Sequence, residues 1–176
     1  TVRAHSCPFA PAPRIPRITR DEWSDDVQAV FDALNVLPFK VPDQTKSHVL
    51  QTLARHPALA KPFLAFNMHL LAAASLPARL RQIAIMRVGW VRRSGYIWPA
   101  HIRVSLNVGL KREDVEAIKV GASSPHWSKL DRAVVTGVDE LIANSELSEA
   151  TWATLAADLD QKQIMDLLFT IGCYTM

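Results

Sequence analysis

The chain has 176 residues, of which 49% are hydrophobic and 21% are charged, and its formal net charge at pH 7 is +3. This length suits one ordinary domain, and the composition is too apolar and too weakly charged for a disordered or collagen-like protein. The two cysteines, Cys7 and Cys173, lie far apart, so the sequence excludes a disulfide scaffold, a cysteine-ligated zinc site, an iron–sulfur cluster and a local dithiol motif.

The charge and hydropathy patterns limit the partners of the protein. Twenty Lys and Arg residues nearly balance 17 Asp and Glu residues, and the arginines are scattered, so we expect no nucleic-acid partner. The apolar runs are far shorter than the ~18 residues of a membrane span. The N-terminus lacks the apolar region of a signal peptide. We therefore expect no membrane partner and a cytoplasmic location.

The beginning of the chain differs from the rest. Four of the 11 prolines lie in the first sixteen residues, which predicts an extended arm over residues 1–18 and a candidate strap between subunits. From residue 19 onward the apolar residues recur with helical spacing, and no hairpin signal interrupts them. Residues 19–176 are therefore expected to form a single all-α domain.

The first three helices have recognisable ends. Ser24 is the expected N-cap of the first helix, which ends before the loop that holds Pro38 and Pro42. Further helices are expected over residues 47–55 and 58–74, where apolar residues again follow a helical period.

The later helices are bounded by proline and glycine. The fourth is expected to begin at Leu76-Pro77 and to stop at Gly95, as a left-handed C′ residue. Pro99 suits the first turn of the fifth helix, which ends near Gly109. The remaining helices are expected over residues 111–120, 129–144, 148–159 and 161–176.

Among the six histidines, His101 has the most informative neighbours, and no metalloprotease, α/β-hydrolase, P-loop or Rossmann motif competes with it. His101 lies near the start of the fifth helix beside Trp98. Burial and the positive end of the helix dipole lower the pKa of an imidazole at such a place and favour a neutral base. Tyr96 adds a phenol that can donate or accept a hydrogen bond. A core histidine bonded to a backbone carbonyl is the alternative interpretation.

From residue 76 to the C-terminus, the chain combines Tyr-x-Trp-x-x-His, a Gly-Leu, an Asp-Glu-Leu and a terminal Gly-x-Tyr, in that order. This combination resembles the carboxymuconolactone decarboxylase family, which includes the AhpD-like alkylhydroperoxidases, over roughly residues 17–176. The resemblance implies an AhpD-like bundle of about eight helices. It also implies a homo-oligomer, as a trimer, hexamer or dimer, with sites near the subunit contacts.

The chain departs from the redox-active members of that family. In those members a glutamate and two cysteines precede the histidine at fixed spacing, and the matching positions here hold Gln82, Ser94 and Ile97. A thiol peroxidase needs a thiolate and a resolving thiol, so we reject that activity. The other branch of the family has an acid at the position of Ile97, so both family acids are absent.

His101 therefore needs a partner from elsewhere, and the candidates are Tyr174, His48, His56 or an adjacent subunit. Arg87 lies on the apolar stripe of the fourth helix and is a candidate to bind a substrate carboxylate. If Arg87 points inward, it needs a buried partner. The candidates for that partner are Asp139 and Glu140.

The first hypothesis is a cofactor-independent enzyme of the carboxymuconolactone decarboxylase type. It would carry out decarboxylase, lyase or isomerase-type proton transfer on a small cyclic or carboxylated organic substrate, with no metal and no cofactor. His101 would be the acid/base and Tyr96 a second catalytic residue, and the expected substrate-binding residues are Trp98, Gln82, Ile97, Met86, Tyr174 and Arg87.

The second hypothesis is a non-catalytic ligand-binding or assembly protein on the same fold. The surroundings of His101 distinguish the two. A water-accessible pocket shared by His101 and Tyr96 favours an enzyme, and a ring sealed among packed side chains favours the binding protein.

Overall fold

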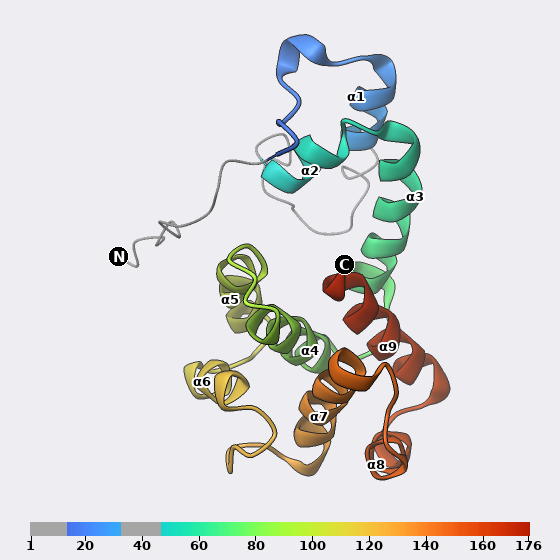
Figure 1. Cartoon of the computed structure of the whole chain (residues 1–176). Helices are drawn as coiled ribbons and strands as arrows, with labels where there is room; N and C mark the ends of the chain where they lie inside the picture. Colours follow the sequence, from blue (N-terminus) through green and yellow to red (C-terminus); the bar gives the residue numbers. More distant parts are fainter. Residues whose placement is uncertain (1–13, 33–46) are drawn as a thin grey trace. The chain divides into compact units, whose positions relative to one another are not determined.

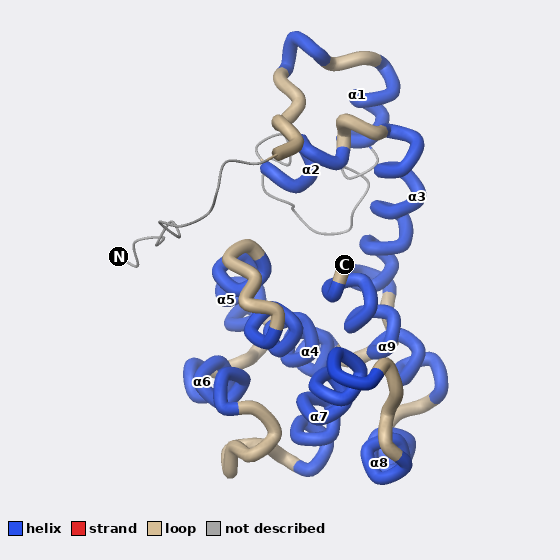
Figure 2. The backbone as a smooth tube through the Cα atoms, in the orientation of Figure 1, coloured by secondary structure: helices blue, strands red, loops and turns tan. Residues whose placement is uncertain are grey.

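The computed structural model describes residues 14–32 and 47–176. Most of the expected N-terminal arm and the loop with Pro38 and Pro42 lie outside these residues. The described part consists of helices joined by loops, without a strand (Figure 2), so the all-α fold is confirmed. These residues form two compact units, 14–73 and 74–176. The expectation of a single domain over residues 19–176 stays a prediction.

The unit 14–73 is built from short helices with local caps. Ser47 Oγ accepts a hydrogen bond from the backbone of Leu50 at 3.4 Å, and His56 Nδ1 accepts one from Leu59 at 3.3 Å. A small core closes around Phe31, whose ring stacks on that of Trp23 at 4.4 Å. The elements are the 3-10 helix η1 (Arg20–Glu22), α1 (Asp25–Asp32), α2 (His48–Leu53), α3 (Pro57–Met68) and the π-helix η3 (His69–Ala73).

Arg55 fixes the stretch that leads into this unit. Its guanidinium donates to the carbonyls of Pro16 and Arg17 at 2.9 Å each and forms a two-point ion pair with Glu22 at 2.7 and 2.8 Å. Hydrogen bonds from Arg55 lower the pKa of Glu22 to about 2. Ile18, at the end of the expected arm, is buried in the same core.

In the unit 74–176 the helix α4 (Ala78–Val91) packs against α5, α6, α7 and α9, while α8 packs against α7 and α9 (Figure 1). The side chains of Ile83, Met86 and Val88 on α4 are fully buried in the shared core. The other helices are α5 (Ile97–Asn107), α6 (Arg112–Val120), α7 (Lys129–Asn144), α8 (Glu149–Asp158) and α9 (Gln161–Thr175).

The expected stop of α4 at Gly95 is wrong. The helix ends at Val91, and the left-handed residue is Arg93, with φ 52°. Arg93 N donates to Trp90 O at 3.0 Å and Ser94 N donates to Gly89 O at 2.8 Å, which is the hydrogen-bond pattern of a Schellman motif with arginine at C′. The early end has a consequence for the next helix, because Ser94 Oγ is then placed to accept from Ile97 N at 3.1 Å and cap the start of α5.

Candidate functional site

His101 and Gln82 meet where α5 crosses α4. His101 Nδ1 lies 3.1 Å from Gln82 Oε1, and the hydroxyl of Ser105, one turn further along α5, donates to the same oxygen at 3.4 Å. Gln82 and Ser105 are both buried. An amide oxygen only accepts hydrogen bonds, so Nδ1 of the ring carries the proton and Nε2 is left with its lone pair.

Burial determines the protonation state of this histidine. Loss of hydration lowers the pKa of His101 to about 4, so the imidazole is neutral at pH 7. The neutral amide of Gln82 fixes the ring without adding a negative charge. A carboxylate in the same place would favour the imidazolium and raise the pKa.

Tyr174, on α9, also packs against the ring of His101. The two rings meet edge to face, with centroids 5.2 Å apart and an interplanar angle of 86°. Tyr174 lies near the end of α9 and also packs against the core of this unit. Of the partners considered from the sequence, Tyr174 is therefore beside His101. His48 and His56 belong to the unit 14–73.

Next to Gln82 on α4, Arg81 faces α9. Arg81 Nε is buried and has no hydrogen-bond partner among the described residues, while Nη1 lies 3.5 Å from the carbonyl of Leu76. Burial lowers the pKa of Arg81, and electrostatic interactions with Tyr174 and Asp166 on α9 act in the opposite direction. Arg81 thus interacts with two α9 residues that lie eight positions apart.

Thr170 lies midway between those two residues. Spacing of four places Asp166, Thr170 and Tyr174 on one face of α9. Thr170 is fully buried, and its Oγ1 has no hydrogen-bond partner in the described part of the chain. In the described residues, the buried side-chain N and O atoms without a hydrogen-bond partner are Arg81 Nε and Thr170 Oγ1. Both belong to the contact between α4 and α9 beside His101.

Asp166 fixes the segment that precedes α4. Its Oδ2 accepts from Ser75 N at 2.6 Å, from Ser75 Oγ at 2.8 Å and from Leu76 N at 3.2 Å. These bonds hold the start of α4 against α9, so the positions of Arg81 and Gln82 relative to α9 are set by the fold.

The two positions where redox-active relatives have thiols serve local structure here. Ser94 caps α5, as described above. Ile97 packs against Gly89, where an added Cβ would lie 2.7 Å from Ile97 Cγ2. Gly89 therefore permits the close approach of α4 and α5 that brings His101 to Gln82.

The remaining expected site residues of α4 and α5 have different surroundings from one another. Tyr96 occupies the N-cap position of α5 and is 53% exposed. Trp98 packs against Trp90, with ring centroids 4.9 Å apart. Met86 is fully buried in the core. Whether these side chains contact a substrate stays a prediction.

Arg87 has a complete set of protein partners. Its Nε and Nη2 donate to Asp139 at 2.7 and 2.9 Å, and Nη1 donates to Ile118 O at 2.7 Å. Of the two partners expected for an inward Arg87, Asp139 forms the pair, while Glu140 accepts hydrogen bonds from Ser148 and Thr151. Gly121, with φ 93°, closes over the guanidinium, because a Cβ there would lie 2.7 Å from Arg87 Nη2. This geometry gives Arg87 a structural role.

Sequence reasoning missed Thr170 and Ser105, and it gave Arg81 no specific role. A signal for Thr170 was present, because Asp166, Thr170 and Tyr174 recur every four residues in the mainly apolar stretch 164–174. No comparable signal identified Arg81, because only the packing of α4 on α9 separates it from the other arginines of the helix.

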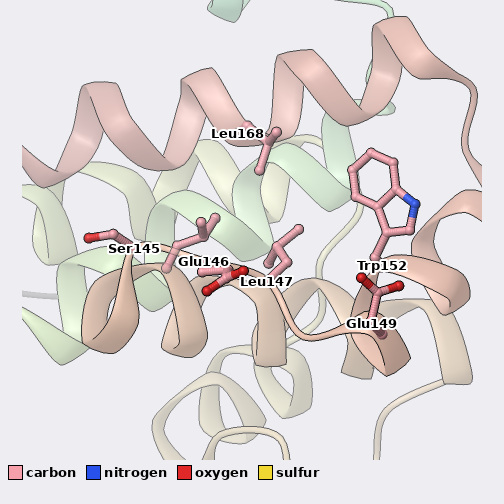
Figure 3. A pocket seen from close by; sticks show the side chains of 7 residues that line it. Ser145, Glu146, Leu147, Glu149, Trp152 and Leu168 are labelled. Atoms are coloured by element: carbon pink, nitrogen blue, oxygen red, sulfur yellow. The ribbon is translucent and has the colours of Figure 1, made fainter.

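A cavity of about 360 Å³ lies elsewhere in this unit, where the turn after α7 meets α8 and α9 (Figure 3). Its walls hold none of the expected site residues. They are formed by Leu141, Ser145, Glu146, Leu147, Glu149, Trp152 and Leu168.

The described residues show neither a group of metal-binding side chains nor a membrane-spanning helix. In residues 14–32 and 47–176, no three His, Cys, Asp or Glu side chains are grouped as metal ligands would be. Over the same residues no helix has the length and apolar character needed to cross a membrane.

The chain matches one family model. Residues 57–136 match the model described as the carboxymuconolactone decarboxylase family. This segment includes α3, α4, α5 and α6, and with them Gln82 and His101. No curated protein matches the sequence.

Several solved structures share the fold. An uncharacterized peroxidase-related protein with an alkylhydroperoxidase AhpD core, from Ralstonia eutropha, has a TM-score of 0.73 at 17% identity over 94% of this chain and 86% of that one. The debrominase Bmp8, solved in complex with 2,3,4-tribromopyrrole, has a TM-score of 0.70 at 16% identity over 93% and 84%. A protein of unknown function from Agrobacterium tumefaciens has a TM-score of 0.63 at 20% identity over 69% and 84%. The AhpD-like fold is therefore established, and one protein that has it is an enzyme.

Proposed function

From the match of residues 57–136 to the carboxymuconolactone decarboxylase family and from the AhpD-like fold of the chain, we propose that this protein is a cofactor-independent enzyme of proton-transfer chemistry, with His101 as its acid/base. The substrate is a small cyclic or carboxylated organic molecule. The reaction is a decarboxylation, a related lyase reaction or an isomerisation.

The observation that supports this proposal is the fixed, neutral imidazole of His101. Gln82 accepts the Nδ1 proton at 3.1 Å, so Nε2 is the basic atom, and burial keeps the pKa near 4. At pH 7 essentially all of the protein then has the lone pair that a general base needs. The imidazolium that forms on proton uptake is a strong acid in this environment and returns its proton readily.

The isomerisation follows directly from these properties. His101 Nε2 removes a proton from the carbon next to a carbonyl group, and the electron pair of the broken C–H bond moves into the carbonyl as an enolate. The imidazolium then gives the same proton to another carbon of the delocalised system. No net proton is gained or lost, and His101 ends in its starting state.

In the decarboxylation, the bond between the carboxylate carbon and its neighbour breaks. Carbon dioxide leaves, and the bonding pair becomes the same kind of enolate. His101 relays one proton from water to the carbanionic carbon. The ring of Tyr174 lies beside the imidazole, with the two centroids 5.2 Å apart, so its phenol is a candidate to assist this proton transfer.

The loss of the thiol positions also supports proton chemistry. Ser94 caps α5 and Ile97 packs against Gly89, so neither offers a thiolate beside His101. Cys173 is buried in α9. Among the described residues, Cys173 is therefore the one thiol, and a two-cysteine peroxidase mechanism has no pair of thiols to act through there.

A turnover screen of wild type and His101→Asn tests the proposal. The substrates are small lactones, β-keto acids and unsaturated carboxylic acids, and product formation is followed by NMR. We expect turnover in the wild type and a loss of about 10²–10⁴-fold in His101→Asn, which is the usual contribution of a general acid/base. Cys173→Ala is the matched control for thiol chemistry and is expected to keep wild-type turnover.

Two outcomes contradict the proposal. Turnover that survives in His101→Asn removes the role of this histidine. Binding of these compounds without turnover in either protein favours the alternative, a ligand-binding protein on the same fold, which the replacement of the family acid by Gln82 also permits.

A further inference from the structure

The substrate class of the proposed reaction can be narrowed from the polar groups of α9 and α4. Thr170 is fully buried, and its hydroxyl has no hydrogen-bond partner among the described residues. A threonine inside a helix normally satisfies its hydroxyl at the carbonyl four residues earlier. Thr154 does so at 2.9 Å and Thr175 at 2.7 Å in this chain. Thr170 differs from both.

Arg81 also differs from the other arginines of α4, because they pair with carboxylates and its Nε has no partner in the described structure. Arg79 pairs with Asp114 and Asp131, and Arg87 pairs with Asp139. The Nε of Arg81 is buried without a partner in the described part of the chain. A buried N–H or O–H that lacks an acceptor or donor costs about 1–3 kcal/mol, and native proteins contain few such atoms. Two of them in one helix contact indicate a ligand-binding function.

The chemistry of the two groups indicates what they bind. Arginine presents a fork of N–H donors that matches a carboxylate, and a threonine hydroxyl can donate a further bond to the same oxygens. We propose that Arg81 and Thr170, with the phenol of Tyr174, form a subsite for the carboxylate of the substrate on which His101 acts. This inference rests on the proposed function and makes the substrate an organic monocarboxylate.

Tyr174 connects this subsite to the reacting group. The centroid of its ring lies 5.2 Å from that of His101, and Tyr174 also interacts electrostatically with Arg81. A carboxylate held between Arg81 and Thr170 therefore places the neighbouring carbons of the substrate toward His101. The subsite thus orients the substrate with its carboxylate on α9 and its reacting carbon at α5.

Asp166 limits the charge of the ligand. It lies one turn before Thr170, and its Oδ2 is bonded to Ser75 and Leu76. Its negative charge also reaches Arg81. A second negative charge on the ligand would be repelled, so we expect a carboxylate to bind more tightly than a phosphate dianion.

Isothermal titration calorimetry on the full chain tests the subsite with three probes: benzoate, its neutral analogue benzamide, and inorganic phosphate. Benzoate is expected to bind the wild type more tightly than benzamide or phosphate. Arg81→Gln is expected to weaken benzoate binding by at least tenfold, and Thr170→Val by about tenfold, the value of one hydrogen bond to a charged group. Arg92→Gln, at the exposed C-cap of α4, is the matched control and is expected to leave benzoate binding unchanged.

Thr170→Val keeps the test decisive if Arg81→Gln does not fold. Valine has the shape of threonine and removes only the buried hydroxyl. Wild-type benzoate affinity in Thr170→Val or in folded Arg81→Gln would overturn the subsite. Equal binding of benzoate and benzamide to the wild type, or no detectable benzoate binding, would overturn it as well.

The subsite and the proposed function can fail separately. His101→Asn removes the base and leaves Arg81 and Thr170 in place, so benzoate binding is measured in that variant too. Binding that depends on Arg81 in a protein without any turnover would leave the subsite standing and remove the enzyme. Turnover that depends on His101, combined with benzoate binding that ignores Arg81, would remove the subsite alone.

Discussion

The polar groups on the two sides of α4 differ in how completely they are paired. On the side toward α6 and α7, Arg79 is paired with Asp114 and Asp131, and Arg87 with Asp139. Asp114 additionally accepts from Lys111 N at 2.7 Å and lies 2.8 Å from His126 Nε2.

The side toward α5 and α9 holds a neutral histidine on a neutral glutamine, and an arginine and a threonine with unpartnered buried atoms in the described structure. Polar groups that are fully paired are explained by stability. Unpartnered buried groups lower stability, which agrees with the binding role proposed for Arg81 and Thr170. The contrast within one helix therefore separates the structural side of α4 from its functional side.

The largest effect is expected on the structural side. Asp139→Ala leaves the mostly buried guanidinium of Arg87 without its two-point partner, and removal of one member of such a pair costs about 3–4 kcal/mol of unfolding free energy. Urea unfolding measures the loss. Asp158→Ala, on the exposed end of α8, is the control and is expected to change stability little. A loss below 1 kcal/mol for Asp139→Ala would mean that Arg87 is not held as the structure shows.

The functional side is expected to make stability depend on pH through His101. Its pKa is about 4 in the folded protein and about 6.5 in the unfolded chain, so the unfolded state binds the extra proton between these values. Stability is complete above pH 6.5 and falls as the pH drops toward 4, by up to about 3 kcal/mol.

Urea unfolding of wild type and His101→Asn between pH 4.5 and 7 checks this prediction. The carboxyl groups whose pKa values are lowered from 3.8 or 4.5, Glu22 among them, lose most of their contribution below about pH 4.5 and add little to the slope across this range. The variant should therefore lack most of the slope. An equal slope in both proteins would show that His101 is hydrated in the folded state.

Gln82→Glu is expected to turn the neutral contact between residue 82 and His101 into a charged pair, like the arginine–aspartate pairs on the other side of α4. A carboxylate beside His101 Nδ1 stabilises the imidazolium, so the pKa of His101 should rise by about 1–2 units. The ring signals of His101 in an NMR titration report the value. Gln82→Met, which removes the hydrogen bond without adding charge, is the control. An unchanged pKa in Gln82→Glu would contradict the contact between the two residues.

The smallest expected effect is on the stability of Thr170→Val, and it tests whether the Thr170 hydroxyl stabilises the fold. Thr170→Val removes a buried hydroxyl without a partner in the described structure, and we expect the free energy of unfolding to rise by about 1 kcal/mol. Thr175→Val, which removes a hydroxyl bonded to Ile171 O at 2.7 Å, is the matched control and should not stabilise. Calorimetric unfolding compares the two. If Thr170→Val destabilises the protein, the hydroxyl is satisfied in solution and the difference between the two sides of α4 is smaller than described.

Much of the fold could be predicted from the sequence, because the signals are local. Ser47, Ser128 and Ser148 each cap the helix that follows them, and Pro99 lies in the first turn of α5. The end of α4 was mispredicted. A glycine normally takes the left-handed position, and here Arg93 takes it two residues earlier.

Within the candidate site, the contact between Gln82 and His101 could be predicted, because the family motif fixes the spacing of these two positions. The family spacing placed Gln82 nineteen residues before His101, and the structure joins them by a hydrogen bond. The need of a buried cation for a partner narrowed the choice for Arg87 to Asp139 or Glu140, and the structure shows Asp139. The unpartnered atoms of Arg81 and Thr170 were not predicted, because only the packing of α4 on α9 determines which polar atoms lack a hydrogen-bond partner in the described structure.

The protonation of His101 in the wild type is the central claim, since its proposed role as a neutral base depends on it. An NMR titration of the wild-type chain, with the His101 signals assigned from their loss in His101→Asn, measures this protonation directly. The account predicts a pKa of about 4, with Nδ1 protonated and Nε2 free at pH 7. A pKa at or above the ordinary value of about 6.5 would contradict it.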